Sequence, residues 1–281
     1  FEMTEELQQI DALQSQDWQL LHDAVRYLES SSWADKLAST LGVPVETLMG
    51  RLPSPLRKRL EGTIEGVLSR AYDIALATHG TGGDDSTSNV GHKLLALSLG
   101  AAGGFFGTAA LLVEIPATTV VMLRSIADIA ASRGEDLSTE EARMACLEVF
   151  ALGSGQADEE RIAEESMFRS SYFATRAMLA QQVTIAVRSL AAGGSLETSS
   201  LLAKLIARIA PRFGVVVSQK AAAQAVPILG AIGGGTVNTL FIDHYQKTAE
   251  AHFSVRKLQR KYGKIVIQQA YEHIATAIER N

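Results

Sequence analysis

"TVNTLFIDHYQKTAEAHFSVRKLQRKYG", residues 236–263, is the most regular stretch of this 281-residue chain and predicts a long amphipathic helix. Gly263 follows the last periodic residue, which is typical of a helix C-cap. The chain contains no series of short alternating strands bounded by turns, so we predict an all-α, multi-helix fold. Eight residues recur at alternating spacings of four and three, and therefore share one helix face: Val237, Phe241, His244, Thr248, Ala251, Val255, Leu258 and Tyr262.

This helix overlaps an uncharged run, residues 221–242, that has a counterpart at residues 94–113. Both runs contain the pattern Leu-Gly-Ala-x-Gly-Gly, and a carboxylate follows each of them, Glu114 after the first and Asp243 after the second. About 20 apolar residues are enough for a helix to span a bilayer. Glycines four residues apart also place small residues on one helix face, so that a second helix can approach closely.

Three interpretations of the two runs stay open: tightly packed buried helices, membrane-inserting segments, or a helix-lined pocket for an apolar ligand. The glycines lower helix propensity, and Pro116 and Pro227 are expected to break or kink the helices near them. We predict that two Gly/Ala-rich apolar segments pack together at the centre of the fold. The candidates for this packing, or for contact with an apolar ligand, are Gly100, Gly103, Gly104, Phe105, Phe106, Gly107, Pro227, Gly230, Gly233 and Gly234.

The remaining sequence predicts further helices and one prominent loop. Residues 1–79 form an N-terminal helical lead, and residues 80–91, rich in glycine, serine and aspartate, form a flexible loop. Residues 92–281 form a helical core. Residues 54–79 belong to the same domain as this core, so we expect one domain overall.

Two helix starts carry capping signals. Ser54 is a candidate N-cap, with Pro55 at the first helical position, where the fixed φ of proline suits a helix. Ser138 and Glu141 have the spacing of a capping box, in which each side chain bonds the other residue's backbone N–H. We therefore predict helices that begin directly after Ser54 and Ser138.

Composition excludes several classes of function. The net charge is −5, with 26 basic and 31 acidic residues, which argues against non-specific nucleic-acid binding. Cys146 is the only cysteine, so neither an internal disulfide nor a cysteine-based zinc site can form. A reducing compartment fits this composition, and the first residues do not resemble a signal peptide. We expect no cofactor, because the chain contains no phosphate-binding loop and no nucleophile elbow.

Polar residues in apolar surroundings predict a buried network. A carboxylate such as Glu114 must be paired, hydrogen-bonded or protonated when it is buried, and Arg124 is a candidate partner. His244 lies on the apolar stripe, where a hydrogen-bonded core histidine is the favoured interpretation. The alternative is a metal site or hydrolase centre built from Glu114, Asp243 and His244. The network candidates are Glu114, Arg124, Asp128, Glu148, Asn238, Asp243, His244 and His252.

A basic cluster lies at the end of the regular helix. Cations at a helix C-terminus complement the helix dipole, and this is the simpler interpretation. The functional alternative is contact with anionic lipid headgroups. The residues concerned are Arg256, Lys257, Arg260, Lys261 and Lys264.

Two long blocks of the sequence resemble the EcsC family. They are "GFFGTAALLVEIPATTVVMLRSIADIAASRGEDLSTEEARMACLEVFALG" (residues 104–153) and "QKAAAQAVPILGAIGGGTVNTLFIDHYQKTAEAHFSVRKLQRKYG" (residues 219–263). The resemblance covers residues 60–270 and implies a bacterial protein from a family without an agreed activity, so no catalytic residue carries over. The positions that match the family's characteristic residues are Glu114, Pro116, Arg124, Asp128, Gly134, Glu135, Asp136, Glu148, Pro227, Gly230, Asn238, Asp243, His244 and His252.

These observations predict a membrane-associated or amphiphile-binding accessory protein that catalyses no reaction. The resemblance implies a link to an ABC transporter or to secretion, and a cytoplasmic location at the inner face of the bacterial membrane. A hydrolase using Glu114, Asp243 and His244 is the alternative, and a purely structural helix-packing module is a third. The sequence leaves open the ligand, the oligomeric state and whether any reaction is catalysed.

Overall fold

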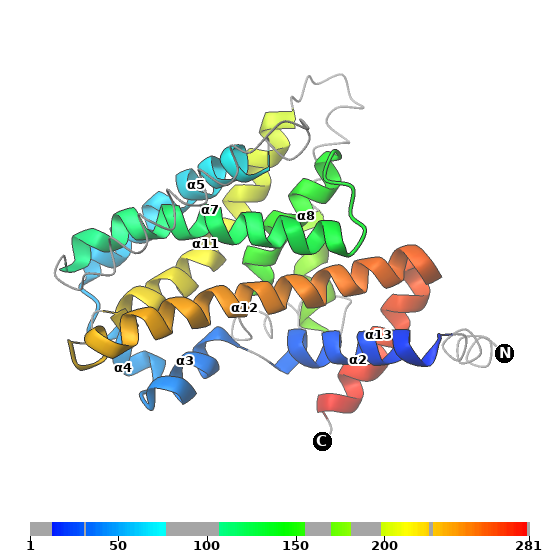
Figure 1. Cartoon of the computed structure of the whole chain (residues 1–281), viewed down its shortest axis with the longest axis horizontal. Helices are drawn as coiled ribbons and strands as arrows, with labels where there is room; N and C mark the ends of the chain where they lie inside the picture. The colour runs from blue at the N-terminus through cyan, green and yellow to red at the C-terminus, as the bar shows by residue number, and fades with distance from the viewer. Residues whose placement is uncertain are drawn as a thin grey trace.

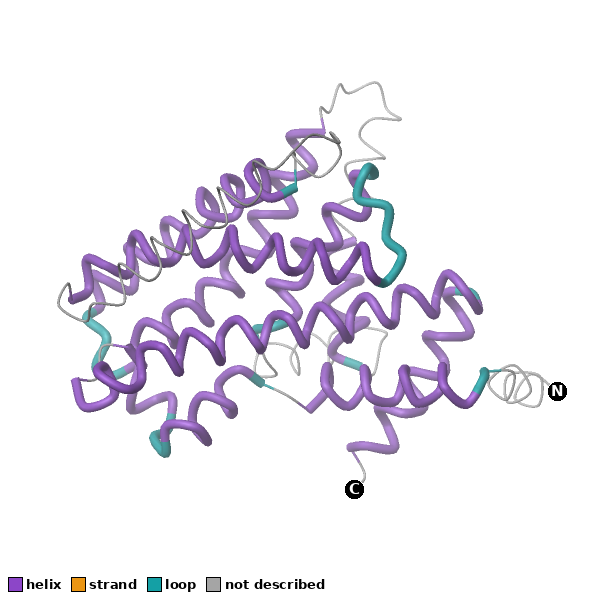
Figure 2. The backbone as a smooth tube through the Cα atoms, in the orientation of Figure 1, coloured by secondary structure: helices purple, strands orange, loops and turns teal. Residues whose placement is uncertain are grey.

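A computed structural model of the chain describes residues 13–30, 32–76, 107–154, 170–180, 198–224 and 227–279. Within these ranges the backbone forms helices joined by turns and contains no strand, which confirms the all-α prediction (Figure 2). The predicted loop at residues 80–91 lies outside the described residues. Gly100, Gly103, Gly104, Phe105 and Phe106 lie outside them as well, so the central packing of the two glycine-rich segments stays a prediction.

The long helix α12 (Pro227–Tyr262) runs across the molecule from one end toward the other (Figure 1). Its 36 residues extend about 54 Å at 1.5 Å per residue. The predicted apolar stripe is confirmed, because its seven residues from Val237 to Leu258 are buried. The helix begins at Pro227 rather than near residue 236, since proline suits the first turn and bundle packing can outweigh the low helix propensity of glycine.

Two sets of helices pack against α12. The first set lies along its N-terminal part and consists of α7 (Gly107–Ser132), α8 (Glu140–Leu152) and α11 (Thr198–Gln224), with α5 (Ser54–Ala75) packed on α7 and α11. α3 (Trp33–Leu41) contacts α11 and α12, and α4 (Val45–Met49) contacts α11. The second set lies along its C-terminal part and consists of α2 (Ser15–Ser30) and α13 (Lys264–Glu279). Residues 171–180 are also helical.

α5, α7 and α12 begin at the same end of the molecule, where α11 ends (Figure 1). Contacts between side chains agree with this arrangement. Glu114, near the start of α7, reaches Lys220, near the end of α11. A Cβ atom on Gly214 of α11 would lie 3.8 Å from the side chain of Glu61, in the second turn of α5. The two apolar helices, α7 and α12, therefore begin at the same end of the bundle as α5 (Figure 1).

Two clusters of buried apolar side chains form the core. The larger contains side chains from α3, α4, α5, α7, α8, α11 and α12, and the smaller joins α2, residues 172–173, α12 and α13. Aromatic side chains pack against one another in the larger cluster. The ring centroids of Phe150 and Phe213 are 4.6 Å apart, and those of Phe150 and Tyr245 are 5.3 Å apart. The helices before residue 80 thus share their core with the later helices.

The helix ends correct three local predictions. Thr139, not Ser138, caps α8, because its hydroxyl accepts from the Ala142 N–H while the Ser138 hydroxyl donates to Asp136. Ser54 is the first residue of α5 and forms no side-chain cap. Of the break or kink expected at Pro116, the break is wrong, because α7 continues as a helix through this residue. The Gly263 C-cap is confirmed, since this residue has a φ of 97° and ends α12.

Candidate functional site

Three polar clusters are built on α12, and we name each after its central residue. The Lys220 cluster joins α12 to α7 and α11. The His244 cluster joins α12 to α2, to α3 and to the turn after α8. The His252 cluster joins α12 to α8 and to the helix at residues 171–180. Each cluster therefore connects segments that lie far apart in the sequence.

In the Lys220 cluster the lysine side chain is 1% exposed. Its Nζ donates to Glu114 Oε1 at 2.9 Å and to Asn238 Oδ1 at 2.8 Å, and it lies 4.5 Å from the centroid of the Phe241 ring. Gln224 Nε2 also donates to Glu114 Oε1, at 3.3 Å. Burial lowers the pKa of Lys220, and the adjacent Glu114 carboxylate opposes that shift.

Glu114 has the partner that its surroundings predicted, but Arg124 was the wrong choice. Arg124 lies ten residues further along α7, which is about 15 Å along the helix axis. Asp128, one turn beyond Arg124, is exposed. Lys220 was missed, although it is the last charged residue before the uncharged run at 221–242. A lone cation beside such a run is the signal that could have found it.

In the His244 cluster a backbone carbonyl determines which imidazole nitrogen carries the proton. Nε2 lies 2.7 Å from the Gly153 carbonyl oxygen, which can only accept, so Nε2 carries the proton and Nδ1 is an acceptor. Burial lowers the pKa of His244 to about 4, against the hydrogen bond to Gly153, which raises it. Gly153 is needed here because a Cβ would lie 2.5 Å from Cε1 of Tyr245.

Tyr27 and Lys36 contact Nδ1, the unprotonated nitrogen of that imidazole. Tyr27 Oη lies 3.2 Å from His244 Nδ1, and Lys36 Nζ lies 3.4 Å from the same atom. Lys36 Nζ also donates to Tyr27 Oη at 2.5 Å and lies 4.0 Å from the centre of the Tyr27 ring. Burial and the nearby Lys247 lower the pKa of Lys36 to about 8. Sequence reasoning missed both residues, which precede the two blocks that carry the family resemblance.

The His252 cluster is a buried charged group with unpaired atoms. His252 is fully buried, and its Nδ1 lies 3.0 Å from the Tyr172 hydroxyl. Its Nε2 lies 3.9 Å from Glu148 Oε2, and Arg176 Nε lies 3.7 Å from the same oxygen. None of these three atoms has a hydrogen-bond partner. Burial raises the pKa of Glu148, and burial with the nearby arginines lowers the pKa of His252.

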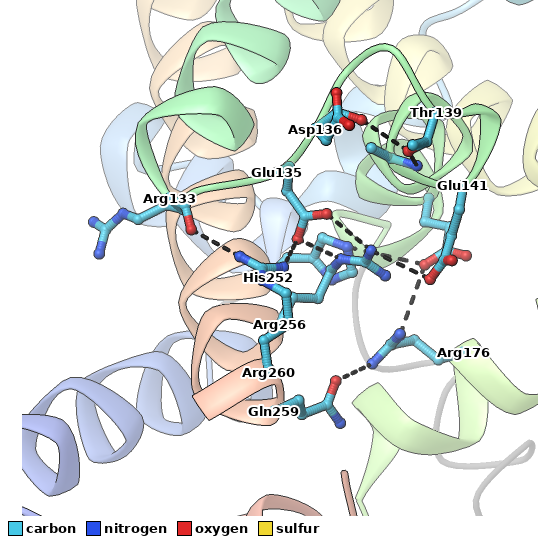
Figure 3. Close-up of polar contacts among 12 residues, drawn as sticks. Arg133, Glu135, Asp136, Thr139, Glu141, Arg176, His252, Arg256, Gln259 and Arg260 are labelled. Atoms are coloured by element: carbon cyan, nitrogen blue, oxygen red, sulfur yellow. Dashed lines mark hydrogen bonds and ion pairs between the residues drawn. The ribbon is translucent and has the colours of Figure 1, made fainter. Parts of the chain in front are cut away.

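Beside this cluster, the turn between α7 and α8 is clamped to α12 (Figure 3). Glu135 accepts from Arg256 Nε at 2.8 Å and from Arg256 Nη2 at 3.0 Å, and Arg260 binds the same carboxylate. Burial opposes ionisation, but the two arginines hold the pKa of Glu135 below its usual range. Arg260 also donates to the carbonyl of Arg133 at 2.8 Å.

Three of the five cations expected to face an anionic surface therefore have partners within the protein. Arg256 and Arg260 bind Glu135, and Lys261 Nζ lies 2.6 Å from Asp17 Oδ2. Lys257 and Lys264 are exposed.

A second cationic surface, which sequence reasoning missed, lies at the start of α5. We call it the α5 cationic surface. No acidic residue occurs between Glu46 and Glu61, and an ion pair of 3.7 Å, from Arg57 to Glu61, lies at its edge. The surface consists of four exposed side chains, those of Arg51, Arg57, Lys58 and Arg59.

The three residues proposed for a hydrolase or metal centre have separate partners. Glu114 pairs with Lys220, His244 bonds Gly153, and Asp243 forms a 3.0 Å surface pair with Lys247. In the part of the chain that the structure describes, no three His, Cys, Asp or Glu side chains are grouped to hold a metal ion.

The fold and its clusters define an all-α protein whose long central helix is tied to its neighbours by buried charged groups. A comparison with known families matches residues 85–258 to the EcsC protein family, and the chain belongs to that family. The match includes α7, α8 and α11 and most of α12, which together supply the Lys220 cluster. Comparisons with curated proteins and with solved structures found no match.

Proposed function

We propose that this EcsC-family protein is a non-enzymatic accessory protein that attaches to an anionic membrane surface through the end of the bundle where α5, α7 and α12 begin. The observation that carries the proposal is the α5 cationic surface. Its four exposed cations are concentrated within nine residues, 51–59, in a chain whose net charge is −5.

The position of these cations within α5 supports a partner outside the protein. A helix N-terminus carries a partial positive charge, so cations near it are unfavourable and acidic residues are preferred. α5 has no acidic residue in its first turn, and Arg57, Lys58 and Arg59 follow directly. An anionic membrane surface would neutralise this concentration of positive charge.

Apolar segments begin at the same end of the bundle (Figure 1). The first seven residues of α7, 107–113, and the first nine of α12, 227–235, are uncharged. Proteins that bind membrane interfaces combine cations with apolar segments, since each cation near an anionic surface contributes about 1 kcal/mol and apolar burial adds to this. One described stretch, Glu114–Ser132, is long and apolar enough to cross a bilayer, but half of it is buried, so it is weak evidence for a span.

The other parts of this proposal rest on family membership. We propose a peripheral location at the cytoplasmic face of the bacterial membrane and a link to an ABC transporter or secretion on that ground. A hydrolase centre built from Glu114, Asp243 and His244 is not proposed, because these three side chains have separate partners.

Co-sedimentation with lipid vesicles tests the proposal. We expect binding to vesicles of phosphatidylglycerol and phosphatidylcholine, weakened by high salt, and little binding to vesicles of phosphatidylcholine alone. The fourfold substitution R51Q/R57Q/K58Q/R59Q should weaken binding by roughly 1,000-fold, because each cation is worth about 1 kcal/mol and every 1.4 kcal/mol is tenfold.

A matched control removes the same charge elsewhere. The fourfold substitution K204Q/R208Q/K257Q/K264Q changes exposed cations on α11 and near the end of α12, and it should bind almost as the parent does. Equal loss in both variants would mean that only net charge matters. Loss in the control alone would assign the attachment to the cations of α11 or to those near the end of α12. Equal binding to neutral vesicles would exclude an electrostatic attachment.

A further inference from the structure

We infer that Lys36 is a reactive amine that forms an imine with a small aldehyde or ketone, at a site made by Tyr27, Lys36 and His244. The site lies between α2, α3 and α12 and contains no residue of the α5 cationic surface, so the inference does not depend on membrane attachment. Its three groups are a primary amine, a phenol and a neutral imidazole, and all three lie within 3.4 Å of one another.

Partial burial and the lack of a counter-ion favour the neutral amine of Lys36, while its two hydrogen-bond acceptors act in the opposite direction. Its Nζ contacts the Tyr27 hydroxyl and His244 Nδ1, and both of these neighbours are uncharged. Among the described residues, no carboxylate lies within ion-pair distance of Lys36. Asp35 accepts from Ser32, and Asp243 pairs with Lys247. A lysine without a counter-ion in a partly buried position loses its proton more easily than one in water.

The side chain is nonetheless accessible. Lys36 is only partly buried, as is Tyr27, whereas His244 behind them is fully buried. Since its pKa is lowered to about 8, a larger fraction of Lys36 is unprotonated at pH 7.5 than of an ordinary lysine. The site therefore places the Lys36 amine in a partly exposed position, beside the partly buried Tyr27 and the buried imidazole of His244.

The three groups can divide the steps of imine formation among them. The Nζ lone pair attacks the carbonyl carbon, and a C–N bond forms as the carbonyl π electrons move to oxygen. Tyr27, whose pKa burial raises, stays protonated. Its hydroxyl donates to the His244 backbone carbonyl at 3.1 Å and can turn to donate to that oxygen. His244 Nδ1, held as an acceptor by the bond from Nε2 to Gly153, can take the proton that leaves nitrogen. His244 then returns its proton to the new hydroxyl, which leaves as water while the nitrogen lone pair forms the C=N bond. The second proton of the nitrogen restores the Tyr27 phenol, so no oxidant or reductant is consumed.

Trapping with pyridoxal and sodium borohydride, followed by mass spectrometry of the tryptic peptides, tests the inference. The reductant fixes any imine as a stable secondary amine. At pH 7.5 we expect Lys36 to be modified at least tenfold faster than Lys58 and Lys204, which are exposed and serve as controls within the same molecule. Equal rates at Lys36 and at the two controls would overturn the inference.

Variants separate the chemistry from a structural role. Tyr27→Phe keeps the ring but removes the proton donor, so the rate at Lys36 should fall severalfold while the rates at Lys58 and Lys204 stay unchanged. Lys36→Arg should abolish the fast adduct. If Tyr27→Phe does not fold, His244→Gln, which can still bond the Gly153 carbonyl, takes its place, and the rate at Lys36 should again fall. An unchanged Lys36 rate in the folded variant would contradict the assigned roles.

Discussion

Among the described residues, Lys220 is a charged side chain that is almost completely buried, with 1% of it exposed. Its ammonium has two oxygen acceptors on two other helices, Glu114 on α7 and Asn238 on α12. A buried charge is tolerated only when such partners replace water. These hydrogen bonds therefore fix the positions of α7, α11 and α12 relative to one another along their axes.

Lys220→Met is expected to lower the free energy of unfolding by about 3 kcal/mol, because it leaves the Glu114 carboxylate without its counter-ion. Urea unfolding followed by circular dichroism measures this change. The double variant Lys220→Met/Glu114→Leu should recover part of the loss, since neither charge then remains. A double variant less stable than the single one would show that the pair acts through some other contact.

His244 makes stability depend on pH in a defined window. Its pKa is about 4 in the folded protein and 6.5 in the absence of burial. Above pH 6.5 the imidazole is neutral in both states and contributes nothing. Between pH 6.5 and 4 the unfolded chain binds a proton that the folded protein does not, so stability falls by about 3 kcal/mol as the pH drops.

Urea unfolding at a series of pH values checks this, with His244→Gln as the comparison. The variant should be less stable at pH 7 but lose less stability between pH 6.5 and 4. Some pH dependence should persist, because burial also lowers the pKa of His252. An identical slope in parent and variant would mean that His244 does not titrate in this way.

At the scale of elements, the turn between α7 and α8 is held by charge as well as by packing. Gly134 adopts a φ of 85°, which few other residues tolerate, and this conformation precedes Glu135 in the turn. The Glu135 side chain is 5% exposed and binds two arginines of α12 (Figure 3). The contact fixes the last turns of α12 against the α7–α8 turn.

Glu135→Gln is expected to destabilise the protein by about 3 kcal/mol, because Arg256 is largely buried and loses its counter-ion. Glu141→Gln is the matched control. Glu141 is 78% exposed and lies 3.6 Å from the same arginine, and exposed ion pairs contribute less than about 1 kcal/mol. Thermal unfolding of both variants compares them. Equal effects would show that burial of Glu135 is unimportant.

At the scale of the whole molecule, the early helices belong to the core although the family match begins at residue 85. Leu21 and Val25 of α2 join α12 and α13, and Trp33 and Leu37 of α3 are fully buried in the larger cluster. Removing these helices would expose the apolar stripe of α12 to water.

We expect a chain that begins at residue 54 to unfold at a clearly lower temperature than the full chain and to bind the dye ANS in its folded state. The lost burial of Trp33, Leu37, Leu21 and Val25 is the physical reason, since each fully buried large side chain contributes about 1.5–3 kcal/mol. Differential scanning calorimetry measures the transition. An unchanged melting temperature would show that residues 54–281 form a stable unit without α2, α3 and α4.

The local pattern of the sequence determined the all-α class, the buried stripe of α12 and the Gly263 cap, because helix periodicity and capping depend on residues within a few positions of each other. The same rules predicted that Glu114 needs a partner. They erred by one residue at Thr139, where Asp136 competes for the neighbouring serine. The predictions of periodicity and capping, both the correct ones and the incorrect one, concern residues within a single helix.

Only the tertiary structure decided which side chains meet. Glu114 and Lys220 are 106 residues apart, and Tyr27 and His244 are 217 residues apart. No spacing rule reaches over such separations, because the relative position of two helices depends on the packing of all the residues between and around them. The hydrogen bond from His244 to Gly153, the reactive position of Lys36 and the end of the bundle that carries the α5 cationic surface all follow from that packing.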